Sequence, residues 1–113
     1  MAKDKGWVKI YRQIWESAIW QVDEPFDRRS AWIDLVLMAN HEDKEKVISV
    51  SDTQKIRRGQ VHCSTKFLAN RWNWSKGKVL RYLALLKSAD MVTTQRYNGR
   101  TLITLIKYSD FQS

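Results

Sequence analysis

The chain has 113 residues, of which 43% are hydrophobic and 28% are charged, and its formal net charge at pH 7 is +8. This length allows one hydrophobic core but not two, so residues 1–113 are predicted to form a single domain. The sequence contains neither the roughly 18 to 20 unbroken apolar residues of a membrane span nor the apolar core of a signal peptide. Cys63 has no second cysteine to pair with, which agrees with a reducing compartment, and we expect a cytoplasmic protein.

The charges are distributed unevenly along the chain. Residues 1–54 hold 8 Lys or Arg and 10 Asp or Glu, whereas residues 55–113 hold 12 Lys or Arg and two acids, Asp90 and Asp110. Basic side chains that only keep a surface hydrated are the alternative, but such surfaces usually mix both signs. The asymmetry therefore favours a basic face directed at a polyanion, and nucleic acid is the expected partner.

Two helices are predicted in the N-terminal half. The first runs from about Val8 to Trp20, where Ile10, Ile14 and Trp15 recur at helical spacing, and Pro25 marks a break after it. The second covers about residues 27–40. Its broad apolar face, which should be buried, consists of Ala31, Trp32, Leu35, Val36 and Met38.

The segment from residue 41 to residue 64 is predicted to contain a turn, two short strands and a loop. HEDKEK (41–46) is a polar turn, while KVISV (46–50) and VHCS (61–64) have the composition of strands. The intervening SDTQKIRRGQ (51–60) is predicted to be a loop that turns at Gly59. A short antiparallel pair and a single strand leading into the next helix fit this pattern equally well.

Two short helices joined by a tight turn are predicted next. Ser64 or Thr65 is a good N-cap for the first helix, in which Leu68 and Trp72 lie one turn apart. Ser75 is a good N-cap for the second, which covers about residues 75–90. The connector between them consists of Asn73 and Trp74, and the apolar stripe of the second helix consists of Val79, Tyr82, Leu83 and Leu86. Two such helices, the second basic at its start, are typical of a helix-turn-helix.

The residues after Asp90 change from helical spacing to the alternation of strands. MVTTQRY (91–97) and RTLITLIKY (100–108) are rich in strand-forming residues and are separated by Asn98-Gly99, the pair that best forms a two-residue hairpin turn. A helix-turn-helix followed directly by a basic hairpin predicts a winged helix. The expected fold class is thus α+β and mainly helical, with about four helices and a C-terminal hairpin wing.

Several stretches of the chain match a known family. They are GWVKIYRQIWES, AWIDLVLMANH, IRRGQ and, above all, STKFLANRWNWSKGKVLRYLALLKSADMV. On these residues the chain resembles, from about Gly6 to Phe111, the N-terminal domain of phage replisome organisers and related DnaD-like replication initiation proteins. The resemblance implies a winged helix that binds origin DNA in a bacterial host cell, associated with the nucleoid. It also implies a longer natural protein whose C-terminal part recruits host replication proteins.

The second helix of the motif carries the expected base-reading residues. If it lies in the major groove, its N-terminal residues Lys76, Lys78 and Arg81 face base edges, and one of them is expected to read a guanine. Ser75 caps the helix, and its backbone N–H is placed to meet a phosphate. Gly77 is either a point of close approach to DNA or a neutral surface position, and the sequence favours neither.

The hairpin and the preceding helix supply further expected DNA contacts. Arg96 and Arg100 flank Asn98-Gly99, so the tip is expected to contact DNA; a charged edge strand that prevents aggregation is the alternative. Thr65 and Lys66 are expected to contact phosphates. The sequence leaves open whether the basic cluster at Lys55, Arg57 and Arg58 extends this track.

Other chemistries find little support in the sequence. The six tryptophans suggest base stacking, but Trp7, Trp15, Trp20, Trp32 and Trp72 are better explained as core, and only Trp74 is left open. His41, His62 and Cys63 do not have metal-ligand spacing, and no nucleotide-binding or hydrolase motif occurs. We expect no enzyme, no cofactor and no metal.

Three functions remain in competition. The first is sequence-specific binding of double-stranded DNA by a replication initiator. The second is a transcriptional regulator of the same fold, and the third is a winged helix used for protein–protein assembly, including self-association. A basic helix and hairpin favour DNA, because an assembly surface should be more apolar.

Overall fold

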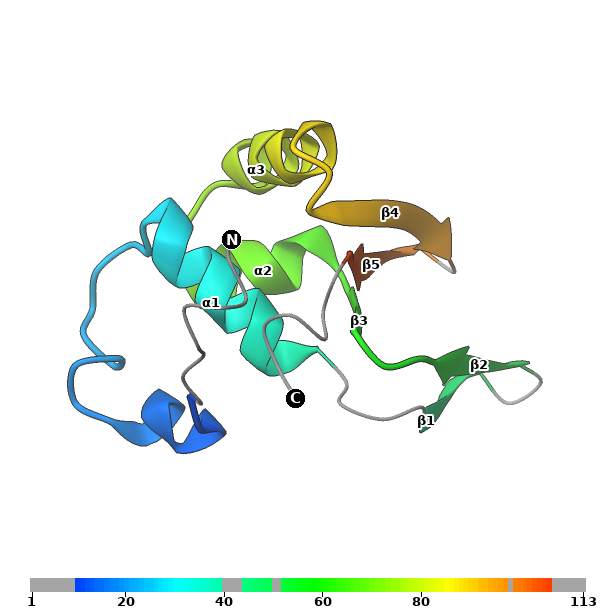
Figure 1. Cartoon of the computed structure of the whole chain (residues 1–113), viewed down its shortest axis with the longest axis horizontal. Helices are drawn as coiled ribbons and strands as arrows, with labels where there is room; N and C mark the ends of the chain where they lie inside the picture. The colour runs from blue at the N-terminus through cyan, green and yellow to red at the C-terminus, as the bar shows by residue number, and fades with distance from the viewer. Residues whose placement is uncertain (1–9, 40–43, 50–51, 98, 107–113) are drawn as a thin grey trace, which may run out of the picture.

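Three α-helices and a three-stranded antiparallel sheet form the α+β architecture of the described residues (Figure 1). The computed structural model describes residues 10–39, 44–49, 52–97 and 99–106, and between residues 44 and 55 it describes only the backbone of two strands. None of the helices in these ranges has the length and apolar composition needed to cross a membrane.

Helix α1 (Arg28–Met38) confirms the second predicted helix. The carboxylate of Asp27 caps it by accepting a hydrogen bond of 2.7 Å from the backbone N–H of Ser30. The helix ends at Ala39, whose backbone is extended. Of the predicted apolar face, Ala31, Leu35 and Val36 are buried, while Trp32 and Met38 are half-buried against the core.

The prediction of a helix from Val8 to Trp20 is wrong for the described part of that segment. Only a 3₁₀ helix, η2 (Arg12–Glu16), forms there, so the expected four helices become three α-helices and one 3₁₀ helix. Tyr11 provides no side-chain cap, and the backbone at Ser17 is extended. The guanidinium of Arg12 instead donates to the carbonyls of Leu37 and Ala39 at the end of α1, at 2.6 and 3.2 Å. These tertiary bonds stabilise a short turn that helical spacing alone does not reveal.

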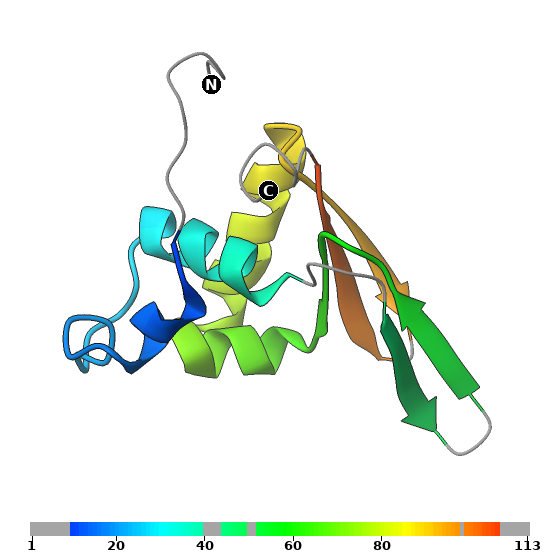
Figure 2. The same ribbon diagram turned by 60° about the horizontal axis from the view of Figure 1, so that its bottom comes forward.

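A β-hairpin occupies much of the stretch that we predicted to be turn and loop. Strands β1 (Lys44–Ser49) and β2 (Asp52–Ile56) pair antiparallel, so the polar turn at 44–46 and the loop at 52–56 are both corrected. The strand predicted at 46–50 agrees with β1 over residues 46–49, whereas residues 44–45 and β2 are mostly polar and lack the apolar alternation by which a strand is recognised. The turn at Gly59 is confirmed by its φ of +81°. In Figure 2 this hairpin extends away from the three helices.

Helices α2 (Thr65–Trp72) and α3 (Lys76–Ser88) confirm the predicted pair, and each begins at a serine cap. The hydroxyl of Ser64, not Thr65, accepts from the N–H of Phe67 at 3.0 Å, and Ser75 accepts from Lys78 at 3.1 Å. Asn73 ends α2 in the left-handed conformation, with φ of 58°. That conformation makes the sharp turn into α3.

The three-stranded sheet has the order β3–β5–β4. Strands β4 (Val92–Tyr97) and β5 (Arg100–Leu105) form the predicted hairpin, and Gly99 in its turn has φ of +74°. Asn98 lies outside the described residues. Strand β3 (Gln60–Cys63) pairs with β5, with Val61 opposite Ile103. The sheet edge is thus completed by a strand that lies before α2 in the sequence.

The core lies between the helices and the sheet (Figure 2). All four residues of the predicted stripe of α3 are buried, as are Leu68 and Trp72 of α2. They pack with Leu35 of α1 and with Ile103 of β5. Trp15 and Trp20 are only half-buried, and Trp7 lies outside the described residues.

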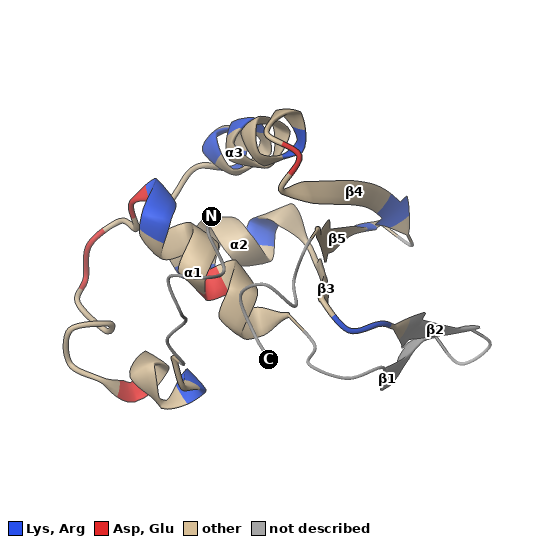
Figure 3. Cartoon of the chain, viewed as in Figure 1, with Lys and Arg blue, Asp and Glu red and all other residues tan. Residues whose placement is uncertain are grey.

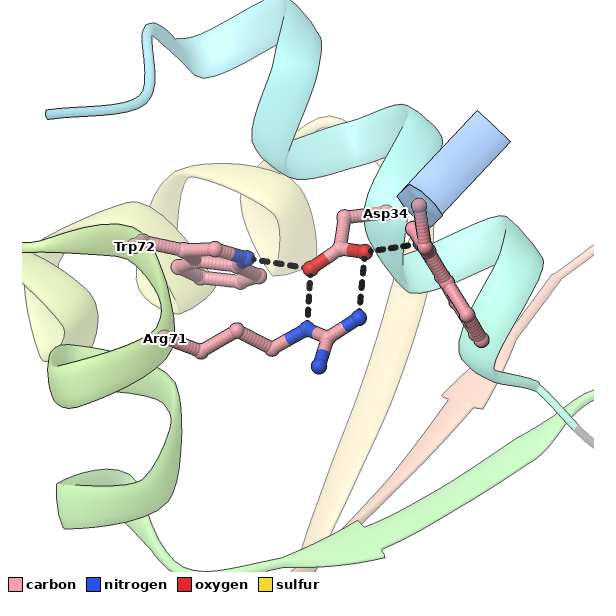
Figure 4. A network of polar contacts seen from close by, with 4 residues as sticks. Asp34, Arg71 and Trp72 are labelled. Atoms are coloured by element: carbon pink, nitrogen blue, oxygen red, sulfur yellow. Dashed lines mark hydrogen bonds and ion pairs between the residues drawn. The ribbon is translucent and has the colours of Figure 1, made fainter. Parts of the chain in front are cut away.

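A buried carboxylate links three of the helical elements (Figure 4). Asp34 of α1 is 0% exposed and forms a two-bond ion pair with Arg71 of α2, with distances of 2.6 and 3.0 Å. Its oxygens also accept from the indole N–H groups of Trp72, at 2.8 Å, and of Trp15 in η2, at 2.9 Å. Nothing in the sequence alone indicated this network, because the three donors lie 19 to 38 positions from Asp34.

Removal of the cation from this network should destabilise the fold. In Arg71→Ala the carboxylate of Asp34 stays fully buried without its ionic partner, so we expect the free energy of unfolding to fall by about 3 kcal/mol. Urea denaturation measures this change. Arg29→Ala removes an exposed guanidinium and should alter stability by less than about 0.5 kcal/mol. Equal stability of the two variants would contradict the structural role of Arg71.

The cap of α1 should make stability depend on pH. The backbone N–H of Ser30, and then its side chain, hydrogen-bond the Asp27 carboxylate and hold its pKa below the ordinary value. The stabilisation is therefore present at neutral pH and is lost as the pH falls below about 4. We expect the Tm difference between wild type and Asp27→Ala to shrink from pH 7 to pH 2.5. Asp27→Asn keeps an uncharged cap, so its Tm difference from Asp27→Ala should not change with pH. A Tm difference between wild type and Asp27→Ala that stays constant with pH would refute the interpretation.

Candidate nucleic-acid interface

Basic residues occur on α3 and at the tip of the β4–β5 hairpin, coloured blue in Figure 3. Lys76, Lys78 and Arg81 are all exposed on α3, and Gly77 among them is half-buried. The buried stripe of α3 faces the core, so these residues occupy the remaining sides of the helix. Cations on that part of α3 can reach a polyanion without disturbing the core.

Lys78 lies on the flank of α3 and is held there by an aromatic ring. Its ammonium is 4.5 Å from the centroid of the Trp74 ring, a cation–π contact. Trp74 itself is 8% exposed and donates its indole N–H to the carbonyl of Phe26 at 2.7 Å. The tryptophan that the sequence left open is therefore part of the core, and Lys78 is directed to the side of the helix.

Gly77 and Arg81 are neighbours on successive turns of α3. A Cβ atom added at Gly77 would lie 3.2 Å from Nη1 of Arg81 and 4.0 Å from the hydroxyl oxygen of Ser75. The guanidinium thus lies over the glycine, towards the N-terminal end of the helix. The sequence offered close approach to DNA or a neutral position for Gly77; the structure adds room for the Arg81 side chain.

The hairpin tip contains two exposed arginines, of which Arg96 also forms hydrogen bonds within the hairpin. Arg96 donates to the hydroxyl of Thr101, its cross-strand partner, and to the carbonyl of Gly99, each at 3.2 Å. These bonds join the two strands across the turn. Arg100 is exposed at the start of β5. The charge of both side chains remains at the tip, but only Arg96 also stabilises the turn.

The predicted phosphate contacts lie at the beginning of α2, and the arginines whose role the sequence left open lie between β2 and β3. Lys66 is exposed and Thr65 is half-buried, one residue after the Ser64 cap. Arg57 and Arg58 are exposed at the turn that precedes β3. In Figure 3 this basic stretch lies below the sheet and far from α3, so the structure does not join it to the α3 surface.

Two arginines that the sequence analysis did not consider lie near the start of α3. Arg28 and Arg29 are exposed at the beginning of α1, within the acidic half of the chain. The carbonyl of Arg28 accepts from the hydroxyl of Tyr82 at 2.7 Å, which attaches this end of α1 to α3. Burial raises the pKa of Tyr82 well above its ordinary value, so the hydroxyl remains a donor. Only this tertiary contact, and no sequence pattern, reveals the proximity.

Within the described ranges, no three His, Cys, Asp or Glu side chains are grouped so as to hold a metal ion. Cys63 is buried, and Nε2 of His62 lies 3.4 Å from the carbonyl of Tyr97 in the neighbouring hairpin. The polar side chains around Asp34 form hydrogen bonds that hold the helical elements together. In these ranges, exposed Lys and Arg residues outnumber the exposed acids, which are Glu16, Asp23, Glu24, Asp27 and Asp90.

Comparison with known proteins adds no relative to this description: no family model matches the chain, and no curated protein or solved structure matches it either. The function must therefore be argued from the residues themselves.

Proposed function

We propose that the chain is a winged-helix domain that binds double-stranded DNA in a sequence-specific manner. In this proposal α3 enters the major groove, and the β4–β5 hairpin is the wing that contacts the adjacent backbone. The observation that carries the proposal is the set of exposed basic residues on α3 and at the hairpin tip, where Figure 3 colours the ribbon blue. Its side chains are Lys76, Lys78, Arg81, Arg96 and Arg100.

The order and pairing of the elements support this assignment. A winged helix has a strand before its helix pair, and that strand joins the hairpin that follows the pair. Here β3 precedes α2 and α3, and it pairs with β5 of the following hairpin. The β1–β2 hairpin is then an insertion between α1 and β3.

The start of α3 has the features of a phosphate-binding helix end. The Ser75 hydroxyl caps the helix, and no acidic residue lies in its first turn. Free N–H groups at a helix start attract anions, and Lys76 adds a positive charge there. This end of α3 is therefore suited to lie against a phosphate while the rest of the helix faces base edges.

The biological setting that we propose is initiation of replication at a phage or plasmid origin. Its support is the resemblance of the quoted stretches to replisome organisers and DnaD-like proteins, which includes segments outside the helix pair. A transcriptional regulator with this fold would bind DNA by the same contacts. Location of the preferred sites in the replicon that encodes the chain distinguishes the two roles: repeated sites at an origin support replication, and sites at a promoter support regulation.

Protein–protein assembly is a second candidate, favoured by apolar side chains near η2. Tyr11 is 68% exposed, Ile19 is 77% exposed and Val22 is 46% exposed, all in the segment before α1. These three residues share one short segment of the sequence, and an exposed apolar patch is typical of an interaction site. Sedimentation without DNA tests this function: oligomers at low micromolar concentration that Ile19→Ser abolishes would support it.

The salt dependence of binding tests the main proposal. We expect fluorescence anisotropy to show duplex binding whose log–log slope against salt is about −4.5, because five cations would each neutralise a phosphate: Lys66, Lys76, Lys78, Arg96 and Arg100. A single strand of the same sequence should bind more weakly. Binding confined to single strands, or no binding to either at low salt, would refute duplex binding and leave assembly as the better account.

The two hairpin arginines should differ in a predictable way. Arg100→Ala is expected to weaken binding to all duplexes by a similar factor and to reduce the salt slope by about 1, with an unchanged Tm. Arg96→Ala should reduce the slope equally but should also lower the Tm, because its bonds to Gly99 and Thr101 are lost. Gln95→Ala, an exposed and uncharged position in β4, is the control. An unchanged slope in both arginine variants would make the hairpin purely structural.

A further inference from the structure

The outermost face of α3 does not carry the mixed charges that are usual on a helix face in contact only with water. Residues in a helix are about 100° apart, which places four residues opposite the buried stripe and two leucines beside that position. The four are Gly77, Arg81, Ala84 and Ser88, and the two leucines are Leu80 and Leu85. Leu80 is 55% exposed, and Ala84 is exposed as well. This face therefore combines small or apolar side chains with a single guanidinium.

The other two cations near the start of α3 lie to the sides of this face. Lys78 is drawn to one side by its contact with Trp74, at 4.5 Å. Lys76 lies in the first turn, on the other side of Gly77. A surface of small groups with flanking ammonium ions matches the shape of a major groove, where the helix approaches the bases and the phosphates lie at both sides. Arg81 is then the one cation of α3 that points to the bases.

Arg81 also has a defined direction. Its Nη1 atom lies 3.2 Å from the position that a Cβ atom of residue 77 would occupy, and so it uses the space that glycine leaves open. A Cβ atom at that position would require the end of the Arg81 side chain to shift by a few tenths of an ångström. Gly77 thus leaves room for Arg81 to extend along the outer face of the helix.

We propose that Arg81 reads a guanine through its O6 and N7 atoms, that Gly77 positions the guanidinium for this contact, and that Leu80 contacts the methyl group of an adjacent thymine. The inference rests on the proposed function and deepens it, because it names the base pairs that the domain recognises. A guanidinium fits the two acceptors of guanine, and an apolar side chain fits the thymine methyl group.

Selection from randomised duplexes, followed by binding measurements on the selected site, tests the role of Arg81. We expect one guanine in the preferred site whose replacement weakens binding of the wild-type chain roughly tenfold. Arg81→Ala should bind the original and the substituted site equally, while its preference at the other positions is kept. Lys87→Ala, which removes a charge from the last turn of α3, should retain the guanine preference.

Gly77→Ala tests positioning separately from stability. Alanine is a better helix former than glycine, so the Tm should not fall. The guanine preference should nevertheless decrease several-fold, because the guanidinium is displaced. In the double variant with Arg81→Ala, the substitution at Gly77 should have no further effect on base preference. A loss that persists in the double variant would show that Gly77 acts on DNA directly and not through Arg81.

The thymine contact is tested with uracil, which lacks only the methyl group. Substitution of uracil beside the recognised guanine should weaken binding of the wild-type chain several-fold, and Leu80→Ala should remove this difference. If the wild-type chain binds duplex DNA and Arg81→Ala keeps the guanine preference, or uracil has no effect, the recognition scheme is overturned and duplex binding stands. If the chain binds no duplex, both proposals fail.

Discussion

The buried carboxylate of Asp34 is the interaction on which the arrangement of the helices depends. A carboxylate that is fully removed from water is costly unless hydrogen bonds and an opposite charge compensate it. Asp34 meets this requirement with the guanidinium of Arg71 and the indole N–H groups of Trp15 and Trp72. Since these donors come from η2 and α2, the compensation is possible only when both elements are docked on α1.

An aromatic cluster fixes the position of α3 relative to α2. The ring of Trp72, one of the Asp34 partners, packs edge-on against Trp74 and Tyr82, with centroid distances of 5.0 and 5.8 Å. Trp74 lies in the connector, and Tyr82 lies on the buried stripe of α3. The rotation of α3 about its axis follows from this packing. That rotation determines which side chains of α3 face outwards, and hence the composition of the proposed base-reading face.

The basic residues of the C-terminal half serve different purposes, which a count of charges does not distinguish. Arg71 is engaged with Asp34 and also lies over the Trp15 ring, at 4.9 Å from its centroid. Arg96 ties the hairpin turn, and Lys78 lies against Trp74. Arg81 is exposed on the outer face of α3. Of these four described residues, only Arg71 is paired with an acid, so the charges of Lys78, Arg81 and Arg96 remain at the surface.

The sequence by itself determined the features that depend on neighbouring residues. The serine caps, the buried stripe of α3 and the hairpin around Gly99 arise from contacts within a few positions, so spacing and residue type are sufficient to predict them. The tertiary structure alone decided the short η2 in place of a helix, strand β2 in place of a loop, and the burial of Trp74. Each of these depends on a hydrogen-bond or packing partner that is distant in the sequence or has no local pattern, and such partners are brought together only when the chain folds.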